Sequence, residues 1–128
     1  MNLPDDVRYT KEHEWVRVEG TTATVGITDH AQEQLGDITY VELPQAGKAV
    51  KQSGELAVVE SVKAASDVYA PVGGTMSGVN AELNEHPEKI NADPYGAGWL
   101  CTLSGVAAAE LDALMTAAQY AAFLKETQ

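Results

Sequence analysis

The chain has 128 residues and carries 8 Lys and Arg against 19 Asp and Glu, a formal net charge of −11. Its 45% hydrophobic and 21% charged residues predict one globular domain over residues 1–128 and exclude a disordered chain. So acidic a surface repels the phosphates of nucleic acids and of anionic lipids, which argues against both as partners. It favours protein partners with a basic docking surface.

The cysteine count and the N-terminal residues bear on where the protein works. A single cysteine, Cys101, excludes an intramolecular disulfide. Residues 1–6 are acidic and have neither the apolar core of a signal peptide nor the Arg-rich character of an organellar presequence. No apolar run is long enough to cross a bilayer. We therefore expect a soluble protein of the cytoplasm, or the mature form of an organellar protein.

Short β-prone runs separated by turn residues fill most of the chain. Residues 15–18 and 23–27 flank Glu19 and Gly20, a pattern that predicts a β-hairpin. Residues 38–43 form a further predicted strand, which stops at Pro44. Between residues 47 and 78, closely spaced glycines and prolines predict very short strands of a compact barrel or sandwich.

Helices are expected at two places. The first begins at Asp29, whose carboxylate is expected to cap the first turn with Gln32 in the capping-box position, and ends at Gly36. A last strand over residues 99–103 is followed by a helical segment at about residues 107–126.

Two features predict the details of the C-terminal helical segment. Leu111, Leu114 and Met115 are spaced as one face of a helix. Thr116 and Gln119 form a second candidate capping box. The fold class that follows is mainly β, with a short helix in the N-terminal half and helices at the C-terminus.

Metal and catalytic chemistry find little support. The three histidines, His13, His30 and His86, lack the spacing of metal ligands, so no metal is expected. Cys101 alternates with apolar residues in a predicted strand, as a buried core residue does. Residues 74–78 lack the spacing of a nucleophilic serine turn, and residues 96–99 predict a turn rather than a dinucleotide loop. No catalytic residue is assigned.

One segment indicates a chemical function. Residues 54–71 contain two β-prone runs on either side of Lys63, with Gly54 and Pro71 as turn residues beyond them. Folded as a hairpin, this segment places Lys63 near an exposed tip. Its neighbours Val62 and Ala64 are small and apolar, unlike the polar residues that surface hairpins favour, and they leave the amine accessible to an enzyme.

These residues resemble the lipoylation segment of the glycine cleavage system H protein family. The resemblance continues in the same order along almost the whole chain, through the following blocks: residues 13–16, 25–32, 35–37, 41–44, Gly47, residues 60–71, Asn91, residues 94–95 and residues 98–99. The turn differs from the Met-Lys-Met type usual in biotin carriers.

The resemblance implies a fold and a function. The fold is a flattened barrel-sandwich hybrid of short strands, with a lipoyl hairpin at about residues 54–71. The function is that of a non-catalytic carrier, which shuttles the aminomethyl group of glycine from a pyridoxal-phosphate glycine decarboxylase (P protein) to a tetrahydrofolate-dependent aminomethyltransferase (T protein). Dihydrolipoamide dehydrogenase (L protein) then reoxidises the carrier, and a lipoate ligase or lipoyltransferase attaches its cofactor.

The resemblance also assigns site residues. (R)-lipoic acid is expected on the Lys63 amine, with the neighbouring side chains recognised by the attaching enzyme: Glu60, Ser61, Val62 and Ala64. The loaded arm would carry a cationic amine, and from this chemistry, rather than from the resemblance, a shelter is expected at Glu14, Asp67 and His30. Two alternatives remain: a lipoyl-relay donor or binding module without glycine cleavage activity, and a biotin carrier.

Overall fold

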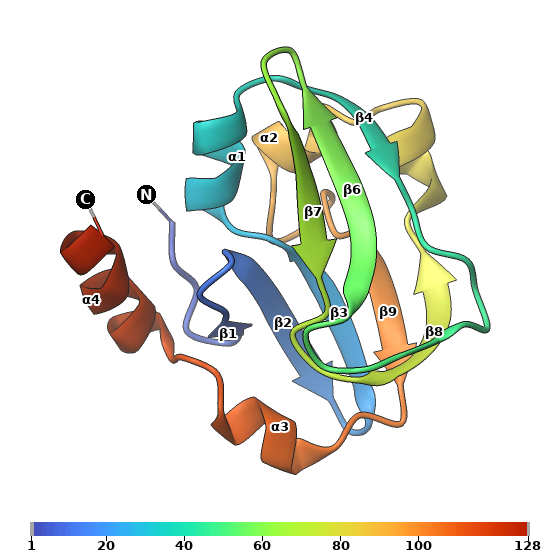
Figure 1. The fold of residues 1–128 in the computed structure, drawn as a ribbon, viewed down its shortest axis with the longest axis vertical. Coiled ribbons are helices and arrows are strands. Elements are labelled where there is room, and N and C mark those ends of the chain that lie inside the picture. The colour runs from blue at the N-terminus through green and yellow to red at the C-terminus, as the bar shows by residue number, and fades with distance from the viewer. Residues whose placement is uncertain (1, 128) are drawn as a thin grey trace.

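The computed structural model describes residues 2–127, which form short strands and short helices (Figure 1). The strands are β1 (Arg8–Tyr9), β2 (Glu14–Glu19), β3 (Thr22–Ile27), β4 (Ile38–Glu42), β5 (Ala49–Val50), β6 (Glu55–Ser61), β7 (Ala65–Tyr69), β8 (Gly74–Val79) and β9 (Cys101–Ser104). The helices are α1 (Asp29–Leu35), the 3₁₀ helix η1 (Ala81–Asn84), α2 (Lys89–Ala92), α3 (Ala108–Asp112) and α4 (Ala117–Thr127).

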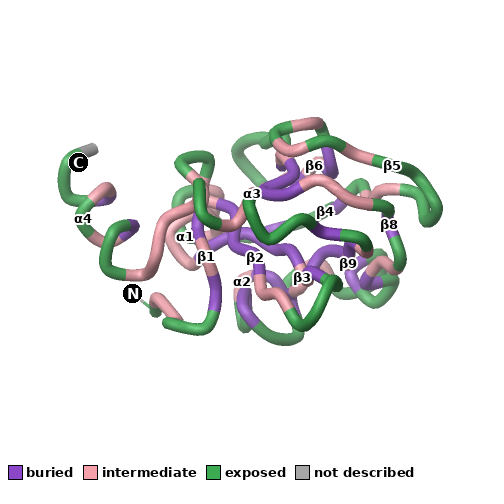
Figure 2. Tube along the Cα trace, turned by 90° about the horizontal axis from the view of Figure 1, so that it is seen from below, coloured by how far each residue is buried: buried purple, intermediate pink, exposed green. Residues whose placement is uncertain are grey.

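The strands form two antiparallel sheets. Six strands follow the order β1-β2-β3-β9-β8-β5, and three follow the order β4-β6-β7. Buried segments gather between these sheets, whereas α4 lies at one end of the molecule (Figure 2). The main core draws its apolar side chains from both sheets, among them Val25 of β3, Val59 of β6 and Leu103 of β9. The mainly β sandwich expected from the sequence is confirmed.

The predicted hairpin around Gly20 is present. β2 and β3 pair from Glu14 opposite Ile27 to Glu19 opposite Thr22, and Gly20 adopts a φ of 65° in the connecting turn. Glycine occupies this conformation without the steric cost that a Cβ would add. The hairpin places Glu14, the first residue of β2, next to the start of α1.

The capping residue predicted for α1 is wrong by one position. Thr28, not Asp29, is the N-cap, and its hydroxyl accepts the Ala31 N–H at 3.2 Å. Asp29 lies one residue inside the helix and accepts a bond from the Gln32 amide at 2.7 Å instead. Thr28 is extended with a ψ of 167° and fully buried, as an N-cap between a strand and a helix can be. Gly36 ends the helix with a φ of 78°, in agreement with its predicted role.

The last strand is shorter than predicted. It begins at Cys101 rather than at residue 99. Trp99 lies outside the strand because its backbone groups make other bonds: its N–H donates to the Gly96 carbonyl, and its carbonyl accepts the Asn80 side-chain amide. Leu100, directly before the strand, donates its N–H to the Val25 carbonyl of β3. β4 likewise ends one residue early, at Glu42.

The C-terminal segment is two helices rather than one continuous helical face. α3 ends at Asp112, and Met115 forms a β-bridge with Tyr9 through two N–H···O bonds of 2.9 Å. This tertiary pairing outweighs the helical spacing of the apolar residues, so Leu114 and Met115 lie between helices. The predicted capping box is confirmed: Thr116 and Gln119 exchange side-chain-to-backbone bonds at the start of α4.

Aromatic contacts anchor α4 to the rest of the molecule. The rings of Tyr120 and Tyr9 stack with centroids 4.6 Å apart. The buried Tyr120 hydroxyl lies 2.9 Å from the Thr28 hydroxyl and 2.7 Å from His13 Nδ1. Each hydroxyl can donate one hydrogen bond. The contacts are satisfied when the Thr28 hydroxyl donates to the Tyr120 hydroxyl and the Tyr120 hydroxyl donates to Nδ1 of a neutral His13. Within residues 2–127, no helix is both long enough and apolar enough to span a membrane.

The His13 contact predicts a pH-dependent stability. Burial and the adjacent His30 lower the pKa of His13, against an opposing effect of Glu12. A lowered folded-state pKa means that the unfolded chain binds the proton first, so stability is lost as pH falls below about 6.5. In His13→Asn, asparagine tolerates the φ of 69° at this position, and the variant should lose about 1 kcal/mol of unfolding free energy at pH 7.5. Between pH 7 and 5.5 its unfolding free energy should fall less steeply than that of the wild type. Urea unfolding across this range measures both, and equal slopes would contradict the prediction.

Candidate functional site: the Lys63 turn and the cavity beside Glu14

Lys63 lies in the tight turn that joins β6 to β7. The Ser61 N–H donates to the Ala64 carbonyl at 2.7 Å, which closes the turn. The Ser61 hydroxyl accepts the N–H groups of Lys63 at 3.3 Å and of Ala64 at 3.1 Å. The turn projects beyond the sheets at the top of Figure 1. One serine side chain therefore shapes the turn, and the hairpin predicted at residues 54–71 is present.

The residues of the turn are open to solvent. Val62 is 73% exposed, and Lys63 and Ala64 are exposed as well. Glu60, half-buried in β6, pairs with Tyr40 of β4. An approaching enzyme can thus reach the Lys63 amine with no rearrangement of the fold.

A second loop supports the turn from below. The Val62 N–H donates to the Asp37 carbonyl at 3.2 Å. Asn91 of α2 fixes this loop, because its amide donates to the Gly36 carbonyl at 2.8 Å and its oxygen accepts the Ile38 N–H at 2.9 Å. The resemblance includes Asp37 and Asn91 but assigns them no role, because pairings between residues far apart in the chain leave no local pattern.

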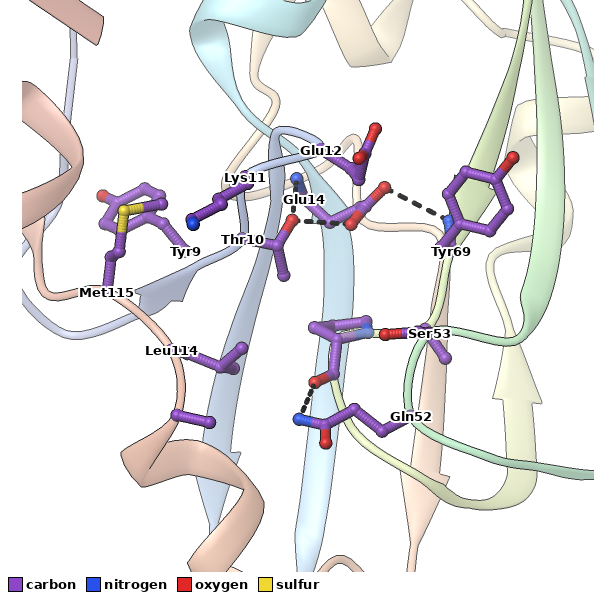
Figure 3. Close-up of a pocket in the computed structure, with 13 residues that line it drawn as sticks. Tyr9, Thr10, Lys11, Glu12, Glu14, Gln52, Ser53, Tyr69, Leu114 and Met115 are labelled. Carbon is purple, nitrogen blue, oxygen red and sulfur yellow. Dashed lines mark hydrogen bonds between the residues drawn. The ribbon is translucent and has the colours of Figure 1, made fainter. Parts of the chain in front are cut away.

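A cavity of about 640 Å³ opens beside the start of β2 (Figure 3). Three segments surround it: the chain from β1 into β2, the end of β7 with the turn before β6, and the link from α3 to α4. Its polar side chains include Thr10, Glu12, Glu14 and Gln52. The predicted shelter residue Glu14 therefore lies at a real hollow.

Glu14 is buried to 2% exposure and hydrogen-bonded at both carboxylate oxygens. Oε1 accepts the Thr10 hydroxyl at 2.6 Å, and Oε2 accepts the Tyr69 N–H at 3.2 Å (Figure 3). Burial raises the pKa of Glu14, while the bonds from Thr10 and Tyr69 oppose this rise. The second bond joins β2 of the six-stranded sheet to β7, the edge strand of the three-stranded sheet.

The other two predicted shelter residues lie elsewhere. Asp67 is exposed on β7 and lines a separate hollow of about 340 Å³ together with Glu42 and Lys48. His30 packs its ring against His13, with centroids 4.6 Å apart, and does not line the cavity beside Glu14. The structure thus brings Glu14 to the cavity but not Asp67 or His30.

Cys101 has the structural position expected for it. It is fully buried within β9, and burial raises the pKa of its thiol to about 12. A thiol in this state is a weak nucleophile. In the part of the chain that the structure describes, no three His, Cys, Asp or Glu side chains are grouped so that they could hold a metal ion.

Comparison with known proteins decides the family. Residues 7–127 match the family model of the glycine cleavage H-protein. The chain belongs to this family. It is 54% identical over 125 residues to the glycine cleavage system H protein of Symbiobacterium thermophilum, with 98% of each chain covered. It is 50% identical to that of Halothermothrix orenii over the full length of both chains.

A solved structure supports the assignment. The chain is similar to the crystal structure of a glycine cleavage system H protein from Mycobacterium marinum, with a TM-score of 0.83 and 38% identity. The alignment covers 93% of this chain and 96% of that one. Glycine cleavage H-proteins are the lipoyl-carrying shuttles of the glycine cleavage system, so the chain is a carrier subunit by family.

The hydrogen bonds of Glu14 predict that two substitutions at this position differ in their effect on the stability of this H-protein family member. Glu14→Ala leaves the Tyr69 N–H and the Thr10 hydroxyl without their acceptor and should cost about 2 kcal/mol. Glu14→Gln can accept the Tyr69 N–H through its oxygen and donate its amide to the Thr10 hydroxyl, so that both contacts remain with the second one reversed. The substitution also removes an ionisation that burial disfavours. Since the folded-state pKa of Glu14 is raised, wild-type stability falls relative to Gln as pH rises from 4 to 7. Urea unfolding tests this, and an Ala variant of wild-type stability would contradict it.

Proposed function

We propose that Lys63 carries (R)-lipoic acid in amide linkage and that the chain shuttles the aminomethyl group of glycine from the P protein to the T protein, with reoxidation by the L protein. The observation that carries this proposal is the position of Lys63. The side chain lies at the exposed turn of a hairpin, in a chain of the glycine cleavage H-protein family. Lys11 also lies exposed in a turn between paired strands, β1 and β2, but outside the segment that resembles the family's lipoylation segment.

The residues of the turn fit an amide-linked arm. Val62 and Ala64 present no charge beside the amine and no bulk that would block it, and the bonds of Ser61 hold the backbone without using the Lys63 side chain. When bound, the lipoyl group supplies a disulfide that is reduced as it accepts the aminomethyl group. Amide formation leaves the Lys63 nitrogen uncharged, so the turn loses its one positive charge.

The arm could be sheltered on the carrier along β7. Asp67 is four residues from Lys63, about 13 Å along a strand, which an arm of about a dozen bonds can span. Two residues further along β7, the Tyr69 N–H is hydrogen-bonded to the Glu14 carboxylate. Glu14 and the neighbouring Glu12 give the cavity acidic groups that suit a cationic amine. Tethering then keeps the cargo at a high effective concentration at each partner.

Replacement of Lys63 tests the assignment. Lys63→Arg should fold as wild type, because an exposed turn residue adds little packing, yet should gain no lipoyl mass and support no glycine cleavage. Lys51→Arg, also exposed, is the matched control and should be lipoylated normally. Mass spectrometry of the intact protein and of its peptides makes the measurement.

The same spectra separate the alternatives. A biotinyl mass on Lys63 would identify a biotin carrier, and a lipoyl mass on Lys63→Arg would overturn the assignment. Wild-type protein that is lipoylated but inactive with the P protein would point to a relay donor.

A further prediction concerns the shelter. Glu14→Gln should speed the loss of the aminomethyl group from the loaded carrier when tetrahydrofolate is absent, because the amide no longer offers a negative charge to the amine. Asp67→Asn tests the second hollow in the same way. Time-resolved intact mass measures the loss, with the extent of lipoylation as the control. Equal decay in wild type, both variants and their double variant would show that neither carboxylate shelters the arm.

A further inference from the structure

Two large apolar side chains are exposed in the part of the chain that the structure describes, and both belong to the region of Lys63. Tyr40 of β4 is 51% exposed and Val62 of the turn is 73% exposed. Single exposed apolar residues are ordinary on protein surfaces. Among the described residues, however, Val62 directly precedes the residue that the proposed function modifies, and Tyr40 lies on the strand paired with the one that leads to it.

The register of the small sheet brings these residues together. Tyr40 pairs with Glu60 on the adjacent strand β6, and Val62 follows Glu60 by two residues. The Val62 N–H is bonded to Asp37, which precedes Tyr40 by three residues. Tyr40 and Val62 thus come from separate segments that are joined directly by backbone pairing beside the Lys63 turn.

The surroundings of this pair are acidic. Lys63 is the single Lys or Arg between residues 52 and 88, and residues 18–47 contain none. Asp37 and Glu42 are exposed on or beside β4, and Glu60 is half-buried opposite Tyr40. A complementary surface would need an apolar hollow with lysine or arginine at its rim.

The turn is also ordered before any partner binds. The bond to the Asp37 carbonyl and the bonds to the Ser61 hydroxyl hold the backbone at and beside Val62. A rigid, presented side chain loses little freedom on docking, so its burial contributes more to affinity. Tyrosines such as the neighbouring Tyr40 are enriched among the anchors of protein interfaces.

We propose that Tyr40 and Val62, surrounded by Asp37, Glu42 and Glu60, are the docking surface for the enzyme that acylates Lys63. This inference rests on the proposed function. In that reaction the Lys63 amine attacks the carbonyl of an activated lipoyl ester, mixed anhydride or thioester. The C–N bond of the amide forms, the bond to the leaving group breaks and the amine loses a proton. The enzyme must bring its reacting carbonyl to Nζ itself, so it must contact the side chains flanking the turn. Enzymes that act at the far end of the arm need no such contact.

Paired variants test the surface. Tyr40→Thr and Val62→Ser should each lower kcat/KM for enzymatic acylation about tenfold, mainly through KM, as the loss of an interface anchor does. Tyr40→Phe and Val62→Leu keep the apolar surface and should retain wild-type rates. Ala49→Ser, an exposed position on β5, is the control for a polar substitution away from the turn. Added salt should raise KM for wild type, because it screens the acidic rim.

Chemical acetylation of Lys63 with acetic anhydride separates docking from damage to the turn. Its rate should be the same in all five variants. Polar variants that are acylated enzymatically at the wild-type rate would overturn the docking surface while leaving the carrier function intact. A parallel fall in chemical acetylation would overturn it too, since the turn itself would then have changed. Wild-type chain that gains no acyl group at Lys63 would overturn the proposed function and this inference with it.

Discussion

A single buried carboxylate joins the two sheets of this fold at the place where its cavity opens. Glu14 begins β2, and its second oxygen accepts the N–H of Tyr69, which belongs to the edge of the other sheet. A carboxylate removed from water is costly unless its oxygens are hydrogen-bonded, and the Thr10 hydroxyl and Tyr69 N–H meet that requirement. The relative position of the sheets and the acidic wall of the cavity therefore depend on the same group.

The backbone conformation of the Lys63 turn does not depend on the chemical state of the Lys63 side chain. Ser61 supplies the bonds within the turn, and Asp37 holds it against the loop that Asn91 fixes. Lys63 contributes only its backbone to this arrangement. Its side chain can change from a cation to a neutral amide while the surrounding hydrogen bonds stay the same. A carrier that visits several partners gains from such separation, because each partner meets the same backbone.

The sequence predicts the features that depend on neighbouring residues. The Gly20 hairpin, the Thr116 capping box and the exposure of Lys63 follow from local patterns, and the structure contains all three. The arrangement of the strands as a flattened barrel-sandwich is predicted from the resemblance to a family. Errors arise where distant residues compete: Met115 leaves a helical pattern because its backbone pairs with Tyr9. The cap of α1 falls on Thr28, whose buried hydroxyl accepts the Ala31 N–H and also contacts the hydroxyl of Tyr120, far along the chain.

The edge position of β7 has a consequence for how copies of this chain behave together. An edge strand can pair with the edge of a second molecule, which is a common start of aggregation. β7 is short and carries Asp67, and the whole molecule has a net charge of −11, so copies repel one another at neutral pH. This protection is electrostatic and disappears near the isoelectric point of about 4.5. The negative charge thus prevents β7, the strand that follows the Lys63 turn, from pairing with β7 of a second molecule. We expect self-association to begin at this strand when the pH is lowered.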